Sequence, residues 1–135
     1  MQQARRIISA ARGLLGVPFR LHGRDPATGL DCIGLVLSVL ERAGHRSLNG
    51  LAPEAYSIRG GSIARFATAM LQAGLRPARM ARAGDVVLVQ AGPAQFHLMI
   101  ATDDGHVHAH AGLGHVVEMP GASTWPVLGR WRWGR

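Results

Sequence analysis

The one cysteine of this 135-residue chain, Cys32, stands between two segments of opposite character. Residues 23–29 are rich in glycine, proline and aspartate, which favour turns. Residues 33–40 are nearly all apolar, and Gly44 follows shortly after them. An apolar run of this length, ended by a glycine, predicts a buried helix over residues 33–43 that begins at or next to the cysteine.

The position of Cys32 at a helix start permits two interpretations. The unpaired N–H groups and the positive end of the helix dipole would face the sulfur, which would lower the pKa of the thiol and make it a nucleophile. Alternatively, Cys32 is a small buried apolar residue, the common state of a free cysteine. A single cysteine excludes a disulfide within the chain and a cysteine-based zinc cluster.

Apolar residues at helical spacing predict two further helices. The first covers residues 3–15, with Ile7, Ile8, Ala11, Leu14 and Leu15 on one face. The second follows Gly61 and is capped by Ser62 and ended by Gly74, with Ile63, Phe66, Ala67, Met70 and Leu71 on one face.

From Gly84 onward the pattern changes to short alternating segments that predict strands. We expect them at residues 85–90, 96–101, 106–111, 115–119 and 127–133, separated by turns that contain glycine. Helices followed by an antiparallel meander indicate an α+β fold. The length suits one domain over residues 1–135, and no repeat or domain boundary is visible.

Three segments carry a resemblance to a known family: residues 18–23 with 29–36 around the cysteine, residues 84–89, and residues 96–100. Together they resemble the NlpC/P60 family of cysteine peptidases, over a span from residue 16 to about residue 118. The resemblance implies a compact papain-like fold, with the cysteine at the start of a central helix packed on an antiparallel sheet. It also implies cleavage of peptides in bacterial cell walls.

The resemblance implies a Cys-His-His triad. Cys32 would be the nucleophile and His97, on the strand that follows the Gly84-Asp85-Val86-Val87 segment, the general base. His108 matches best the third residue, which orients the base, and His110 is the alternative. Taken without the resemblance, a histidine on a strand is more often a structural or surface residue.

The segment before the nucleophile departs from the family pattern. Phe19 stands where the family usually carries a tyrosine, so a hydroxyl donor is missing from the wall of the site. We expect Phe19, His22 and Asp31 to contribute to substrate or oxyanion binding, with His22 or Arg20 as substitutes for the missing hydroxyl. The backbone N–H of Cys32 would be one oxyanion donor.

Four histidines, at positions 106, 108, 110 and 115, also raise the question of a metal. His106, His108 and His110 alternate along one strand and would project to one face. No carboxylate or cysteine motif completes a recognisable ligand set, so we predict no metal and no cofactor. No apolar segment approaches the roughly 18 residues that span a bilayer.

The chain has a net charge of +7 and a pI near 11.6, and all its basic side chains except histidine are arginines. The charge suits an anionic partner, either nucleic acid or the acidic cell wall. Trp125, Trp131 and Trp133 lie near arginines and could stack on bases, but the arginines form no run longer than two. We therefore expect no nucleic-acid partner and expect Trp131 and Trp133 to pack against a helix or a partner subunit.

Substrate and location follow from the resemblance alone. Family members mostly cut the γ-D-glutamyl–diaminopimelate bond of peptidoglycan stem peptides. The segments His22–Pro26 and Asp31–Leu35 look most like small peptidases encoded with phage tails and gene-transfer particles, which implies tail-tip proteins as partners. The N-terminus lacks a continuous apolar signal region, so we expect synthesis in the cytoplasm and delivery to the cell wall in a particle. The alternatives are an amidase or acyltransferase with another substrate, and a non-catalytic tail or nucleic-acid-binding module.

Overall fold

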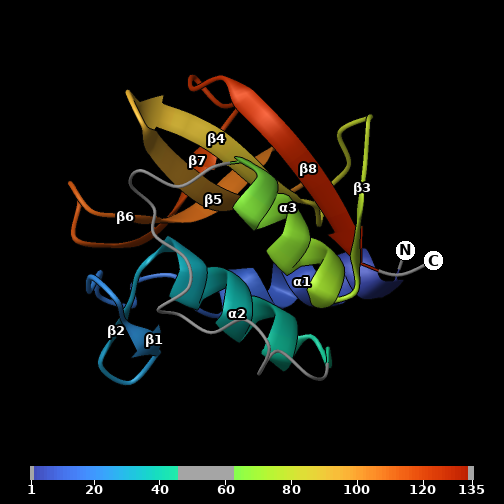
Figure 1. The fold of residues 1–135 in the computed structure, drawn as a ribbon. Helices are drawn as coiled ribbons and strands as arrows, with labels where there is room; N and C mark the ends of the chain where they lie inside the picture. Colours follow the sequence, from blue (N-terminus) through green and yellow to red (C-terminus); the bar gives the residue numbers. More distant parts are fainter. Residues whose placement is uncertain (1, 46–62, 134–135) are drawn as a thin grey trace.

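The computed structural model describes residues 2–45 and 63–133. Within them, three helices pack against a six-stranded antiparallel sheet (Figure 1). The helices are α1 (Gln2–Arg12), α2 (Cys32–Arg42) and α3 (Ile63–Gln72). The sheet has the order β3-β8-β4-β5-β6-β7, formed by β3 (Leu75–Pro77), β4 (Val86–Gly92), β5 (Gln95–Ala101), β6 (Gly105–His110), β7 (His115–Pro120) and β8 (Val127–Trp133). A separate pair, β1 (Arg24–Asp25) and β2 (Gly29–Leu30), precedes α2.

The α+β fold predicted from the sequence is confirmed, and α2 begins at Cys32 as expected. The first helix, however, ends at Arg12 instead of continuing to residue 15, so Leu15 leaves the apolar face and is exposed. In α3, Phe66 and Met70 are buried, whereas Ile63 and Leu71 are exposed, contrary to the predicted apolar face. The expected cap at position 62 lies outside the described residues. No helix in the described ranges is long and apolar enough to cross a membrane.

The main core lies between the helices and one face of the sheet. Helix α2 is its centre, because eight of its residues from Cys32 to Leu40 are buried. Alternate residues of β4 and β5, including Leu88, Leu98 and Ile100, meet this helix from the sheet. The other face of the same strands carries a smaller cluster of Val87, Val89 and Met99, on which the ring of Trp125 packs.

Strands β5 and β6 pair over only part of their length. Their ladder contains the pairs Ile100↔Val107 and Ala101↔His106, and beyond these the paired register is not continued. Helix α2 contacts both strands, and the backbone N–H of Leu98 hydrogen-bonds the thiol of Cys32. The separation of the two strands therefore admits the start of the helix, and this brings the cysteine to the sheet.

The segment between α1 and β1 ties the outer strand of the sheet to the region before α2. Its backbone bonds β7 through Gly16 N–H to Val116 O, at 2.9 Å, and the residue before β7 through Phe19 N–H to Gly114 O, at 2.8 Å. It then bonds β2 through Leu30 N–H to Pro18 O, at 2.9 Å. These bonds fix the backbone of Phe19 beside the start of α2.

Candidate active site

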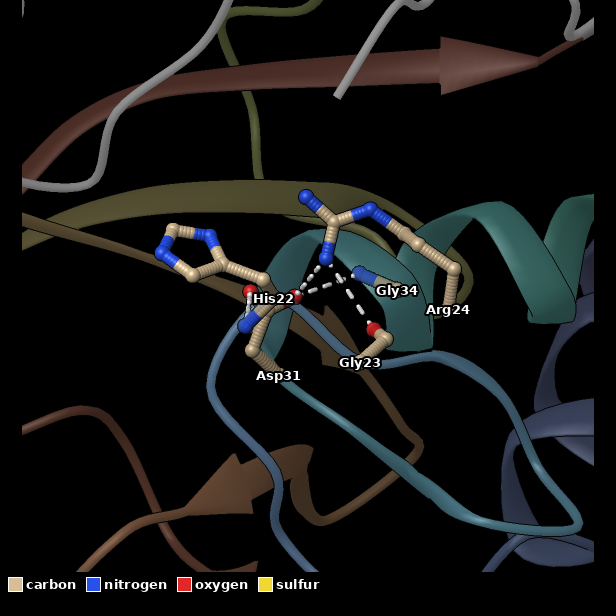
Figure 2. Close-up of polar contacts among 5 residues, drawn as sticks. All are labelled: His22, Gly23, Arg24, Asp31 and Gly34. Atoms are coloured by element: carbon tan, nitrogen blue, oxygen red, sulfur yellow. Dashed lines mark hydrogen bonds and ion pairs between the residues drawn. The ribbon is translucent and has the colours of Figure 1, made fainter. Parts of the chain in front are cut away.

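The start of α2 is held by the carboxylate of Asp31, which is its N-cap (Figure 2). Oδ1 accepts hydrogen bonds from the backbone N–H of Gly34, at 2.8 Å, and from Nη1 of Arg24, at 2.7 Å. Oδ2 accepts from the backbone N–H of His22, at 3.0 Å. The carboxylate is buried, with 2% of the residue exposed, and the ion pair with Arg24 compensates the charge there. The cap thus fixes the backbone at the point where the loop ends and α2 begins with Cys32.

Two glycines make this arrangement sterically possible. A Cβ at Gly34 would lie 2.0 Å from the carbonyl oxygen of Gly23, and a Cβ at Gly23 would lie 2.3 Å from the carbonyl oxygen of Gly29. Both obstructing atoms are backbone atoms, which cannot move aside as a flexible side chain can. The first turn of α2 therefore packs directly on the backbone of the preceding loop, and the glycine two residues after Cys32 has a structural cause.

A pocket of about 290 Å³ opens beside Cys32. Six of the side chains that line it come from five parts of the chain: Phe19, Cys32, His97, His108, His110 and Trp125. The cysteine, the candidate base His97 and both candidates for the third residue are therefore brought to one cavity. The ring of Phe19 forms part of the wall, in the place predicted for it.

The imidazoles of His97 and His108 form a hydrogen-bonded pair across the separated ends of β5 and β6. Nε2 of His97 lies 2.9 Å from Nδ1 of His108. The bond occupies one nitrogen of His97 and leaves Nδ1 for another partner. Among the described residues, His97 and Cys32 share the pocket but are not hydrogen-bonded to each other. His110 instead accepts a hydrogen bond at its Nδ1 from the backbone N–H of Leu113, at 3.0 Å.

The predicted low pKa of the thiol is wrong for this structure. Cys32 is buried, with 1% of the residue exposed. Burial raises its pKa to about 12, despite hydrogen bonds from the backbone of Leu98 and Ile33 that act in the opposite direction. Loss of solvation of a thiolate thus outweighs the favourable field at the helix start. The sequence shows the helix start but not how completely the sulfur is enclosed.

Burial acts on the histidines in the opposite sense, because their charged form is the protonated one. It lowers the pKa of His97 to about 4, with further lowering from His110 and His106. It also lowers the pKa of His108 to about 3, with a contribution from His97. At neutral pH the site therefore holds a thiol and two neutral imidazoles. A neutral thiol and a neutral imidazole do not form an ion pair at rest. They can instead transfer a proton from sulfur to imidazole during attack on a substrate.

The remaining predicted residues lie near the site but outside the pocket. His22 is exposed, and its backbone rather than its ring bonds Asp31. Asp31 is buried beneath the first turn of α2, where its oxygens accept three hydrogen bonds. Neither residue is among those that line the pocket.

Trp125 is a residue of the site that the sequence does not reveal. Its ring lies edge-on to both imidazoles, with centroids 5.5 Å from His97 and 6.0 Å from His108. Composition alone groups it with the other two tryptophans. Trp131 is buried in the core, however, and Trp133 is partly buried and packs edge-on to His45. No local pattern marks Trp125, because its position depends on the loop between β7 and β8.

The clustered histidines do not form a metal centre in the part of the chain that the structure describes. No three His, Cys, Asp or Glu side chains there are arranged to hold a metal ion. His106, His108 and His110 project to one face of β6, as predicted, with ring centroids of successive residues 5.4 and 5.2 Å apart. His115 lies on the neighbouring strand β7, where Nδ1 bonds the carbonyl of Leu113.

Comparisons with solved structures find the same fold. The chain is similar to the NlpC/p60 domain of peptidoglycan hydrolase SagA, with a TM-score of 0.59 and 24% identity, over 87% of this chain and 88% of that one. It is similar to the P60 domain of an antigen from M. avium subspecies paratuberculosis, with a TM-score of 0.59 and 23% identity, over 98% and 94% of the two chains.

A third similar structure is an NLP/P60 family protein from Staphylococcus aureus, described as similar to lipoprotein, with a TM-score of 0.63 and 21% identity. The match covers 96% of this chain but 41% of that protein. A search of curated proteins found no match. The model of the NlpC/P60 family matches residues 16–125, which include Cys32, His97 and His108. The chain therefore belongs to the NlpC/P60 family.

Proposed function

We propose that this protein is a cysteine peptidase that hydrolyses peptidoglycan stem peptides, at the γ-D-glutamyl–diaminopimelate bond. The observation that carries the proposal is the single pocket that joins Cys32 to the hydrogen-bonded pair of His97 and His108. These three residues have the chemical types of a nucleophile, a base and a group that orients the base. Family membership supplies the class of substrate.

The mechanism begins from the neutral site. Nε2 of His97 faces His108, so Nδ1 is the nitrogen that accepts the thiol proton while the sulfur attacks the amide carbonyl. The developing oxyanion lies near the backbone N–H of Cys32 at the start of α2. His97 then gives its proton to the leaving amine, and water hydrolyses the thioester to release the acid and restore the thiol.

His108 is the better third residue than His110. It is buried and hydrogen-bonds His97, whereas the described bond of His110 is to the backbone of Leu113. By accepting the N–H of His97 at Nε2, His108 would hold the imidazole in the tautomer whose Nδ1 is free to act as a base. Phe19 supplies a wall of the pocket but no hydroxyl, so the second oxyanion donor comes from another group.

The decisive experiment is digestion of purified diaminopimelate-type muropeptides with the wild type and with Cys32→Ala, followed by mass analysis of the products. We expect the wild type to release the diaminopimelate-containing fragment and the variant to lose at least about a thousandfold in rate. His115→Gln is a matched control, because His115 is exposed on β7 and lines neither the pocket nor the cap.

An inert wild type would contradict the peptidase proposal. Acylation of Cys32 by a simple activated ester, without cleavage of muropeptides, would instead support an acyltransferase or amidase that acts on another substrate. If the wild type shows neither cleavage nor acylation, the protein is a non-catalytic module. Cleavage at a different bond would keep the peptidase and correct its specificity.

The site of action that we propose is the bacterial cell wall, reached in a phage-tail or gene-transfer particle. The support is the resemblance of the segments around residues 22–35 to those of particle-encoded peptidases. Mass analysis of purified particles tests it: the protein should be present in stoichiometric amount, and its absence from particles removes this part of the proposal.

A further inference from the structure

A second pocket, of about 200 Å³, adjoins the pocket beside Cys32 at the outer face of β6. His108, His110 and Trp125 line both pockets, whereas Cys32 and His97 line only the first. The second pocket therefore lies beyond His108 as seen from the cysteine. It is closed by the loop between β7 and β8, residues 121–126. A ligand that extends from Cys32 past His97 would reach it.

A hydrogen bond fixes which nitrogen of His110 carries the proton, and the proposed mechanism fixes the same for His108. Nδ1 of His110 accepts the backbone N–H of Leu113, so the neutral ring must carry its proton on Nε2. If His97 acts as a base through Nδ1, its proton lies on Nε2 and is donated to Nδ1 of His108. The ring of His108 then also carries its proton on Nε2. This step rests on the proposed function.

The two histidines consequently present N–H donors without a charge of their own. Their ring centroids are 5.2 Å apart on one face of β6. The third imidazole on that face, His106, lines only the second pocket. Among the described residues that line the two pockets, there is no aspartate or glutamate to accept the free N–H groups.

A carboxylate is the ligand that this arrangement suits. It accepts hydrogen bonds only, can accept from two donors at once, and makes stronger bonds with N–H groups than a neutral amide does. An ammonium group would find no acceptor on the same two nitrogens. The electron-rich ring of Trp125 would meet the apolar part of the bound residue.

The mechanism indicates which side of the substrate enters this pocket. His97 must pass its proton to the leaving amine, so the leaving residue lies beside the imidazole. We propose that His108 and His110 bind a free carboxylate of the leaving residue, and that the enzyme thereby selects stem peptides whose diaminopimelate side chain ends in a carboxylate rather than an amide.

The test compares two tetrapeptide stems that differ only in whether the side-chain carboxyl of diaminopimelate is free or amidated. Binding of each is measured by calorimetry to Cys32→Ala, and to the same protein with His110→Ala, His110→Gln or His115→Gln. We expect His110→Ala to weaken binding of the free acid about tenfold and to leave the amide unchanged. His110→Gln, which retains an N–H donor, should recover most of the affinity, and His115→Gln should have no effect.

Turnover gives a second readout with Cys32 in place. His110→Ala should raise KM for the free acid about tenfold with kcat nearly unchanged. An equal loss of kcat/KM with the acid and the amide peptide would overturn the proposal. A fall in kcat at constant KM would also overturn it, because it would mark His110 as a catalytic residue.

The two proposals fail in distinguishable ways. Binding is measured without the nucleophile, so it does not depend on cleavage. If the wild type cuts neither peptide while the acid still binds in a His110-dependent manner, the carboxylate site stands and the peptidase assignment fails. If both peptides are cut and bound equally, the carboxylate site fails and the peptidase assignment stands.

Discussion

Trp125 stands with its ring edge-on to both His97 and His108, at interplanar angles of 82° and 89°. The backbone on either side of it is held by the hydroxyl of Ser123, which accepts the N–H of Trp125 and donates to its carbonyl, each at 3.0 Å. A large ring fixed in this way excludes water from the imidazole pair. This exclusion contributes to the burial that lowers the pKa of His97 to about 4.

Replacement of the ring should therefore shift the pH profile. A base is active only when unprotonated, so kcat/KM of the wild type should fall as pH falls through about 4. In Trp125→Ala, water reaches His97, its pKa rises towards the usual value, and the acid limb should move upward by about one pH unit. Trp125→Phe should keep the limb near its original place.

Trp133→Phe is the control, because Trp133 packs on His45 at the far end of β8, away from the pocket. The measurement is kcat/KM from pH 3.5 to 8. An unchanged acid limb in Trp125→Ala would show that the ring does not shield the base.

At the same scale, the sequence predicts the identities of the candidate reacting residues better than their state. Cys32, His97 and His108 line one pocket, in agreement with the site that the resemblance to the family implies. Which of His108 and His110 bonds His97 depends on where the pairing of β5 and β6 stops. If their ladder continued, other residues of the two strands would lie opposite each other. The pKa of the thiol depends on enclosure by residues distant in the chain, which no local pattern records.

Helix α2 is the element that positions Cys32, and the backbone of its first turn packs on the backbone of the loop before it. The N-cap of Asp31 and the contact between Gly34 and Gly23 are both local in sequence. The apolar run after Cys32 predicts where the helix begins, but Asp31 is expected from the sequence to contribute to substrate or oxyanion binding, and its role as the N-cap is not predicted. Strands β1, β2 and β3, of two or three residues each, are too short to produce an alternating pattern, and the sequence does not predict them.

The close contact predicts a large effect of one methyl group. Gly34→Ala would place Cβ 2.0 Å from the carbonyl oxygen of Gly23, so the helix or the loop must move. We expect the free energy of unfolding to fall by about 3 kcal/mol and cleavage to fall by at least about tenfold, because Cys32 moves with the turn.

Gly13→Ala provides the comparison, since its Cβ would meet backbone oxygens no closer than 3.4 Å, an ordinary contact. Urea unfolding and muropeptide cleavage are measured for both variants. Equal stability of the two would contradict the view that the first turn of α2 rests on the loop backbone.

Across the whole molecule, one sheet separates two apolar clusters, and the ring of Trp125 joins the smaller cluster to the histidine pair. The periodicity of the sequence predicts the five longest strands and the order of the elements, because each strand alternates between the two faces. The order of the strands in the sheet is not local information: β8 inserts between β3 and β4. Buried neutral histidines on that sheet also make the stability of the fold depend on pH.

Acid should destabilise the protein through these histidines. In the unfolded chain a histidine binds a proton as pH falls below about 6.5, whereas folded His97 and His108 remain neutral down to about 4 and 3. The unfolded state therefore gains protons first, and the free energy of unfolding falls between about pH 6.5 and 4, by on the order of a few kcal/mol.

His108→Gln removes one of these groups and should flatten the dependence, whatever its effect at neutral pH. Urea unfolding of the wild type, His108→Gln and His115→Gln at pH 7, 5.5 and 4.5 tests this. The exposed His115 serves as the matched control. If the free energy of unfolding falls equally with pH in all three proteins, His108 is not a source of the acid sensitivity.

The enclosure of Cys32 has a consequence for the durability of the protein. Oxidants attack the thiolate, and burial raises the pKa of Cys32 to about 12, so the sulfur is held as the thiol at pH 7. The resting protein is thus guarded against conversion of its one sulfur to sulfenic acid, and against cross-linking of two copies through a disulfide. In the proposed mechanism the thiol reacts only when a substrate brings His97 into contact with it, so the resting protein should lose its thiol slowly on storage.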